Sequence, residues 1–86
     1  MSGLSDLPNL GKTVIAQLEA AGIRTAAQLK RLGSVGAALK LQAQGVSVCA
    51  SKLSALEGAI RGVRWHSIPA EERKALRERF EKRASG

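Results

Sequence analysis

The stretch from Ser47 to Trp65 most constrains the fold, because its apolar residues recur with helical spacing. They follow one another at steps of four, three, four and three, and they are Cys49, Leu53, Leu56, Ile60 and Val63. This spacing places them on one stripe of a helix. Ser47 is a candidate N-cap for that helix, and Gly62 is a candidate stop. We expect the other elements of this short chain to pack against it.

Two further features belong to the same predicted helix. Ala55, Gly58 and Ala59 are small, so a neighbouring backbone can approach closely on their side. Glu57 precedes Arg61 by four residues, the favourable order for a surface ion pair worth a few tenths of a kcal/mol. The sequence therefore predicts a helix that is apolar on one side and closely approached on another.

A glycine ends the first helix that we predict, which covers residues 12–21. Gly22 suits the left-handed position beyond a helix end. Leu18 and Ile23 then fall where a Schellman stop makes its apolar contact. The pattern indicates a helix that is closed sharply at this point.

Caps and glycines predict two more short helices before the central one. Thr25 and Gln28 form a capping box, which starts a helix that ends at Gly33. Ser34 is expected to cap a third helix, and Gly45 is expected to end it.

The last predicted helix follows a cap at Ser67 and has Pro69 in its first turn. Its apolar stripe is thin and consists mainly of Leu76 and Phe80. With this helix the sequence predicts an all-α fold of about five helices in one compact domain over residues 1–86. Residues 1–6 and 84–86 are expected to be flexible.

The composition agrees with an all-α fold and indicates the cellular compartment. The chain has 86 residues, 44% of them hydrophobic, with one Trp, one Phe and no Tyr, so its core must be aliphatic. The single cysteine, Cys49, excludes an internal disulfide and is expected to be a small core residue. No uncharged run approaches the roughly 18 residues of a membrane span, and no signal-peptide layout is present. We therefore expect a cytoplasmic protein.

The chain has a large excess of basic over acidic side chains. Fourteen basic side chains against seven acidic ones give a net charge of +7. Such a surplus attracts polyanions, nucleic acid first and anionic lipid second. The alternative is that the charge serves only solubility.

Several short motifs resemble those of the TfoX C-terminal domain family. They are residues 56–62 (Leu-Glu-Gly-Ala-Ile-Arg-Gly), Trp65, Ile68-Pro69, residues 7–11 (Leu-Pro-Asn-Leu-Gly), residues 21–25 and Gln28-Leu29. The resemblance covers about residues 4–80. These are bacterial domains found in, or related to, regulators of competence for DNA uptake. The resemblance implies a helical fold related to helix-hairpin-helix domains and a regulatory or DNA-uptake context.

The turn from Leu7 to Thr13 is the best local candidate for a site, because it resembles a helix-hairpin-helix DNA-binding turn. Gly11 allows close backbone approach, and Lys12 and Thr13 add donors beside the helix N-terminus, which favours phosphate. Asn9 departs from the pattern, since such turns usually have glycine there. The alternative interpretation is a plain helix-entry turn.

Other bases join this turn only if the fold gathers them. The predicted nucleic-acid contacts are Gly11, Lys12, Thr13, Lys30, Arg31, Arg61 and Arg64. The last helix carries acids early and bases late, as its dipole favours, so we interpret it as a solvated helix. We expect Trp65 to be the largest core anchor rather than a base-stacking residue, and His66 to need no role.

The sequence gives no support for catalysis. Its one His, one Cys and one Asp do not form a triad at their spacings, and it has no metal-ligand cluster or nucleotide-binding glycine loop. We therefore predict a non-enzymatic module without cofactor, metal or small-molecule substrate. The leading partner is the DNA phosphate backbone. The alternative is a protein partner or a homodimer, and membrane binding is disfavoured because the basic last helix lacks a wide apolar face.

Overall fold

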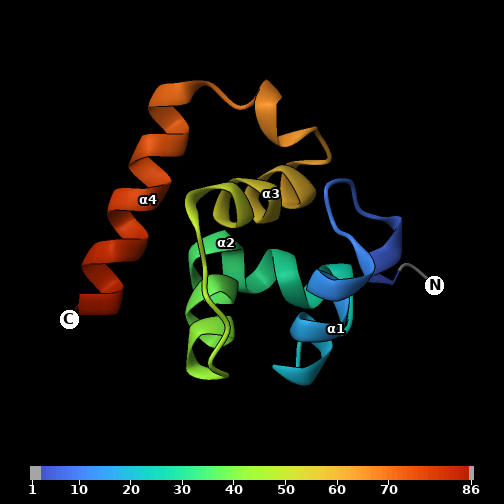
Figure 1. Ribbon diagram of the computed structural model, residues 1–86. Coiled ribbons are helices and arrows are strands. Elements are labelled where there is room, and N and C mark those ends of the chain that lie inside the picture. Colours follow the sequence, from blue (N-terminus) through green and yellow to red (C-terminus); the bar gives the residue numbers. More distant parts are fainter. Residues whose placement is uncertain (1–2, 86) are drawn as a thin grey trace.

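The computed structural model describes residues 3–85, which form one compact helical domain (Figure 1). Within this part of the chain lie four α-helices and two short 3₁₀ helices. In chain order they are η1 (Leu4–Asp6), α1 (Lys12–Ala20), α2 (Ala26–Ala43), α3 (Ala50–Arg61), η2 (Trp65–Ser67) and α4 (Ala70–Ser85). The prediction of an all-α single domain is confirmed. The flexibility predicted for residues 1–2 and 86 falls outside the described residues.

Helix α3 crosses the middle of the molecule and contacts α2, α4 and η2 (Figure 1). Leu53 and Leu56 are buried, as the stripe predicted, and Ile60 is partly buried. The prediction is wrong at the two ends of the stripe, because Cys49 is exposed and Val63 is 39% exposed. Both residues lie outside Ala50–Arg61, so the helical period does not hold them to the core side.

The N-terminus of α3 also differs from the prediction. Its N-cap is Cys49, two residues after Ser47, and no side chain makes a capping hydrogen bond there. The C-terminus is as predicted, with Gly62 in the left-handed conformation at φ 76°. Helix α3 is therefore closed at its end and open at its beginning.

The second and third predicted helices form one kinked element, α2, which is why four α-helices replace the expected five. Gly33 produces the kink with φ 79° and ψ 167°, a conformation that glycine adopts without strain. The predicted capping box is confirmed: the Gln28 N–H donates to Thr25 Oγ1 at 3.1 Å, and the Thr25 N–H donates to Gln28 Oε1 at 3.2 Å. Ser34 caps nothing, because its hydroxyl donates to Glu57 Oε1 at 2.7 Å.

The predicted Schellman stop after α1 is confirmed. Gly22 has φ 89°, and the Ile23 N–H donates to the Leu18 carbonyl at 2.9 Å. Gly45 has the same role after α2, with φ 84°. These stops turn the chain back so that Leu18 and Ile23 are both fully buried.

Near its start, the described chain has a residue that is packed into the core. Leu4 in η1 is only 2% exposed. Ser67 lies in η2 and does not cap α4, whose first backbone bonds go to the carbonyl of Pro69. Leu76 and Phe80 are buried as predicted, and α4 extends to Ser85. None of the described helices is long and apolar enough to cross a membrane.

Candidate nucleic-acid interface

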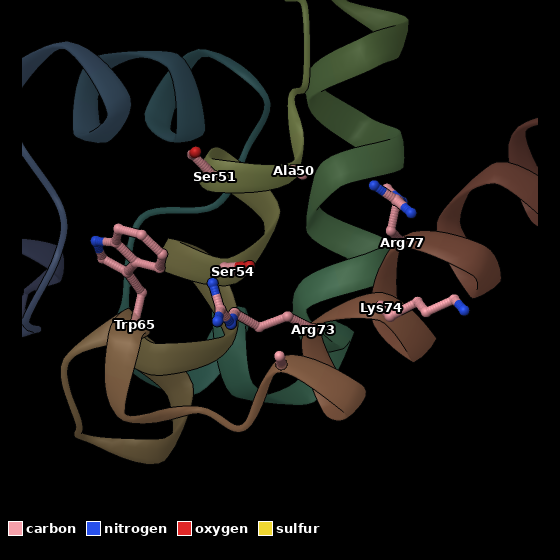
Figure 2. A pocket seen from close by; sticks show the side chains of 8 residues that line it. Ala50, Ser51, Ser54, Trp65, Arg73, Lys74 and Arg77 are labelled. Atoms are coloured by element: carbon pink, nitrogen blue, oxygen red, sulfur yellow. The ribbon is translucent and has the colours of Figure 1, made fainter.

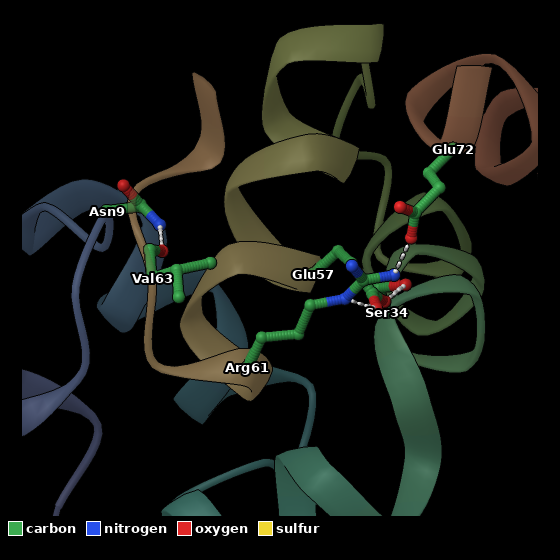
Figure 3. A network of polar contacts seen from close by, with 6 residues as sticks. All are labelled: Asn9, Ser34, Glu57, Arg61, Val63 and Glu72. Atoms are coloured by element: carbon green, nitrogen blue, oxygen red, sulfur yellow. Dashed lines mark hydrogen bonds and ion pairs between the residues drawn. The ribbon is translucent and has the colours of Figure 1, made fainter. Parts of the chain in front are cut away.

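Asn9 and Gly58 fix the bend that follows α3. Asn9 adopts φ 70°, and its Nδ2 donates to the Val63 carbonyl at 2.8 Å (Figure 3). Its Oδ1 accepts from the Trp65 N–H at 3.2 Å. A Cβ at Gly58 would lie 2.5 Å from Asn9 Nδ2 and 2.7 Å from the Val63 carbonyl oxygen. The close approach predicted for the small residues is thus confirmed at Gly58. Asn9, which departs from the helix-hairpin-helix pattern, ties the predicted turn to this bend.

The bend leaves Trp65 only partly buried. The prediction of Trp65 as the largest core anchor is wrong, because Trp65 lies in η2 beside α3 and outside the hydrophobic core. The Arg73 guanidinium carbon is 5.4 Å from the indole centroid, and the His66 ring meets the indole edge-on at 5.1 Å. Arg73 Nε also donates to the Ile68 carbonyl at 3.1 Å, so this guanidinium is held in place on two sides.

A first hollow of about 340 Å³ lies between the N-terminal half of α3 and α4 (Figure 2). Bases from α4, hydroxyls from α3 and the indole line it: Arg73, Lys74, Arg77, Ser51, Ser54 and Trp65. A second hollow of about 500 Å³ shares Ser51 and Trp65 with the first, so the two adjoin. The second hollow is also lined by Asn9, Val14, Lys52, Arg64 and His66.

We call the two adjoining hollows the basic groove. Its lining contains five of the chain's bases, namely Lys52, Arg64, Arg73, Lys74 and Arg77. None of its lining residues is acidic, whereas Glu57 and Glu81 each line another hollow. Neutral oxygens hold the Lys52 ammonium, since its Nζ lies 3.3 Å from both Gln17 Oε1 and the Ser47 carbonyl. The groove is therefore positive along its length.

Arg61 has a different environment, which we call the carboxylate clamp (Ser34, Glu57, Arg61 and Glu72). Arg61 Nε lies 2.6 Å from Glu57 Oε2, as the spacing predicted, and its Nη2 lies 2.8 Å from Glu72 Oε1 (Figure 3). Burial acts to raise the pKa of Glu57, but hydrogen bonds from Ser34 and Arg61, with the charges of Arg61 and Arg79, outweigh burial and lower it. Hydrogen bonds to Glu57 and Glu72 raise the pKa of Arg61.

The structure separates the predicted contact residues. Gly11 is the N-cap of α1 without a side-chain cap, and Lys12 and Thr13 are exposed in its first turn. Arg64 lines the basic groove. Arg61 is occupied in the carboxylate clamp. Lys30 and Arg31 are exposed on α2 and line neither hollow of the groove.

Four bases of the groove are absent from the predicted contacts. Arg73, Lys74 and Arg77 were interpreted as part of a solvated helix, and Lys52 was given no role. One local signal existed, because Arg73 and Arg77 are four residues apart and Lys74 and Arg77 are three apart, which places them on neighbouring positions of one helix. That this side of α4 faces the start of α3 depends on tertiary packing. Among residues 3–85 no group of three or more His, Cys, Asp or Glu side chains is arranged to hold a metal ion.

A family model described as the TfoX C-terminal domain matches residues 1–80. The chain belongs to the TfoX C-terminal domain family. This TfoX C-terminal domain is similar to an uncharacterised protein from Listeria monocytogenes in a triclinic crystal form, with 41% identity, a TM-score of 0.86 and coverage of 94% of this chain and 92% of that one. A protein of unknown function from Listeria monocytogenes in a tetragonal form has 42% identity, a TM-score of 0.84 and coverage of 92% and 96%. Among curated proteins none matches the chain.

Proposed function

We propose that this TfoX C-terminal domain is a non-enzymatic, cytoplasmic module that binds the nucleic-acid backbone without sequence specificity, in a regulatory or DNA-uptake context. The observation that carries the proposal is the basic groove, where five Lys and Arg side chains meet and no acidic residue contributes to the lining. Phosphates of a nucleic acid neutralise such a surface and release their counterions. Membership of a regulatory family supports the same context.

The turn before α1 adds to this surface. Gly11 caps α1 without a side-chain bond, so the first N–H groups of α1 are available to a phosphate, next to Lys12 and Thr13. Asn9 and Val14, which flank these three residues, both line the basic groove. The turn therefore borders one end of the groove, and one strand of backbone can contact both.

Salt-dependent binding tests this function. Fluorescence anisotropy of a labelled duplex is measured against protein at several salt concentrations, with two unrelated sequences. We expect the logarithm of the binding constant to fall linearly with the logarithm of salt concentration, by about 0.9 per neutralised phosphate, and equally for both sequences. Absence of binding at low salt would reject the function.

A charge-reversal pair tests the part played by the turn. Lys12→Glu is expected to weaken duplex binding, while Lys40→Glu, an equal charge change on an exposed residue of α2, should weaken it less. Circular dichroism confirms that both variants are folded. Equal affinities for the two variants would remove the turn from the site.

A further inference from the structure

The start of α3 opens into the first hollow of the groove. The first backbone bond of α3 runs from the Leu53 N–H to the Cys49 carbonyl, and no side chain caps the helix. The N–H groups of the first three residues therefore have no acceptor within the helix. Two of these residues, Ala50 and Ser51, line the hollow (Figure 2). Helix α2, by contrast, is closed at its start by a full capping box.

A buried hydroxyl in the same hollow gives a second, independent indication of a ligand. Ser54, one turn along α3, is only 4% exposed and lines the hollow. Its hydroxyl makes none of the side-chain hydrogen bonds found among residues 3–85. Every fully enclosed side-chain oxygen in that part of the chain has a partner, so the Ser54 oxygen must open onto the hollow. A buried hydroxyl that faces a hollow without a protein acceptor is a donor available to a ligand.

Cations complete the lining on the α4 side. Arg73 extends toward Trp65 (Figure 2), and its Nε is bound to the Ile68 carbonyl, so its terminal nitrogens remain as donors. Lys74 and Arg77 add two charges. Arg77 has one acidic contact, with Glu81 at 3.5 Å, and both side chains of this pair are more than half exposed, so the pair is weak.

We propose that this hollow is a phosphate-binding site. The amides at the start of α3 and the Ser51 and Ser54 hydroxyls donate to the phosphate oxygens on one side, and the guanidinium groups of Arg73 and Arg77 donate on the other. Trp65 forms the wall against which the attached organic group lies. A phosphomonoester and a nucleic-acid phosphodiester present the same kind of oxygen, so the site does not depend on the proposed function. If the phosphodiester is the source, the hollow locates the backbone contact of that function.

The single tryptophan makes the site directly measurable. Trp65 is the only Trp and the chain has no Tyr, so intrinsic fluorescence reports on the wall of the hollow alone. The wild-type domain is titrated at constant ionic strength with glycerol 3-phosphate in one series and with an oligothymidylate that has no terminal phosphate in the other. Amide chemical shifts at Ala50 and Ser51 are followed by NMR. We expect a saturable change in both signals with at least one probe.

Matched variants locate the binding. The double variant Lys74→Gln with Arg77→Gln is expected to bind the probe about tenfold or more weakly, because charge-assisted hydrogen bonds are lost. The control, Lys82→Gln with Arg83→Gln, makes the same change of net charge at the far end of α4 and should leave binding within about twofold. Ser54→Ala, which removes one oxygen and retains the packing, should also weaken binding of the probe. If the double variant does not fold, Ser54→Ala alone tests the site.

Each outcome separates the two proposals. Binding of the phosphate ester alone identifies a small-molecule source and supports the site, and the salt-dependent duplex titration then decides the nucleic-acid function separately. Oligonucleotide binding that depends on Ser54 and Arg77 supports the site with nucleic acid as the source. Oligonucleotide binding that responds equally to the groove variant and the control overturns the site and leaves the function standing. Failure of both probes overturns the site.

Discussion

The carboxylate clamp and the basic groove both take charged residues from α3 and α4, but positive charge is neutralised in the clamp and left available in the groove. In the clamp, Arg61 near the end of α3 meets Glu57 and Glu72 within 2.8 Å. In the groove, α4 contributes three bases to a lining that contains no acid. Glu72 and Arg73 are consecutive in the sequence, yet one belongs to the clamp and the other to the groove. The net charge of the chain is thus a poor guide to where an anion binds, because part of the basic charge is neutralised internally.

The two regions also differ in what holds them. The clamp contains a partly buried carboxylate with two hydrogen-bonding partners, so it contributes mainly to stability. The groove consists of bases gathered around Trp65, and its position depends on the bend that Asn9 and Gly58 fix. Changes in the clamp should therefore alter stability, and changes in the groove should alter binding.

Gly58→Ala should have the largest effect, because it disturbs the bend that carries the groove. The new Cβ would clash with Asn9 Nδ2 and the Val63 carbonyl, at 2.5 and 2.7 Å. Overpacking of this kind lowers the free energy of unfolding by about 1–3 kcal/mol. Urea denaturation measures this change in the free energy of unfolding. The control, Gly36→Ala in α2, places its Cβ at an ordinary 3.5 Å from Leu32 Cβ and should raise stability by about 0.5–1 kcal/mol. Equal effects of the two changes would contradict the close approach at Gly58.

Glu57→Gln should break the clamp and leave the groove intact. Loss of the charged partner of Ser34 and Arg61 is expected to lower the free energy of unfolding by about 1–2 kcal/mol. Glu78→Gln, on the exposed surface of α4, has the same charge change and should alter stability by less than about 0.5 kcal/mol. Chemical denaturation at neutral pH compares them. The clamp would lose its assigned role if both variants were equally stable.

The same variant should change the pH dependence of stability. The pKa of Glu57 is lowered on folding from its ordinary value of 4.5, so its contribution is present above that value and is lost as the pH falls through the folded pKa. Wild-type protein should therefore lose more stability between neutral and acidic pH than Glu57→Gln does. Denaturation curves over this range show the difference, and parallel curves would contradict the lowered pKa.

Ser34→Ala is a smaller change within the clamp. It removes the hydroxyl that donates to Glu57 at 2.7 Å, and the expected loss of stability is about 0.5–1.5 kcal/mol. The control is Ser47→Ala, at a residue that the sequence predicted as a cap and the structure leaves outside α3. Thermal unfolding should show a lower midpoint for Ser34→Ala only. A loss at Ser47 would instead support the capping role.

Local chemistry explains which parts of the fold could be predicted. The Thr25–Gln28 box, the stop at Gly22 and the Glu57–Arg61 pair each depend on residues within five positions of one another, so spacing alone specifies them. The end of the apolar stripe at Cys49 was mispredicted because the start of α3 has no cap to mark it. The division at Gly33 was predicted, but as two helices rather than one kinked element.

The candidate site was predictable only in part, because it depends on contacts between distant segments. The bases at Arg64 and at Lys12 were named from the sequence. Asn9 contacts the bend more than fifty residues further along the chain, and no local pattern shows this. In the same way, Glu72 pairs with Arg61 only after α4 packs beside α3, and no local pattern shows this contact.

The most direct test of the difference between clamp and groove compares two arginines three residues apart. Arg64→Gln and Arg61→Gln make the same change of net charge, and the salt dependence of duplex binding is measured for each folded variant. Arg64→Gln should reduce the slope of log binding constant against log salt by about 0.9, the value for one phosphate contact, and Arg61→Gln should leave it unchanged. An equal reduction for both variants, or a reduction for Arg61→Gln alone, would contradict the assignment of available charge to the groove.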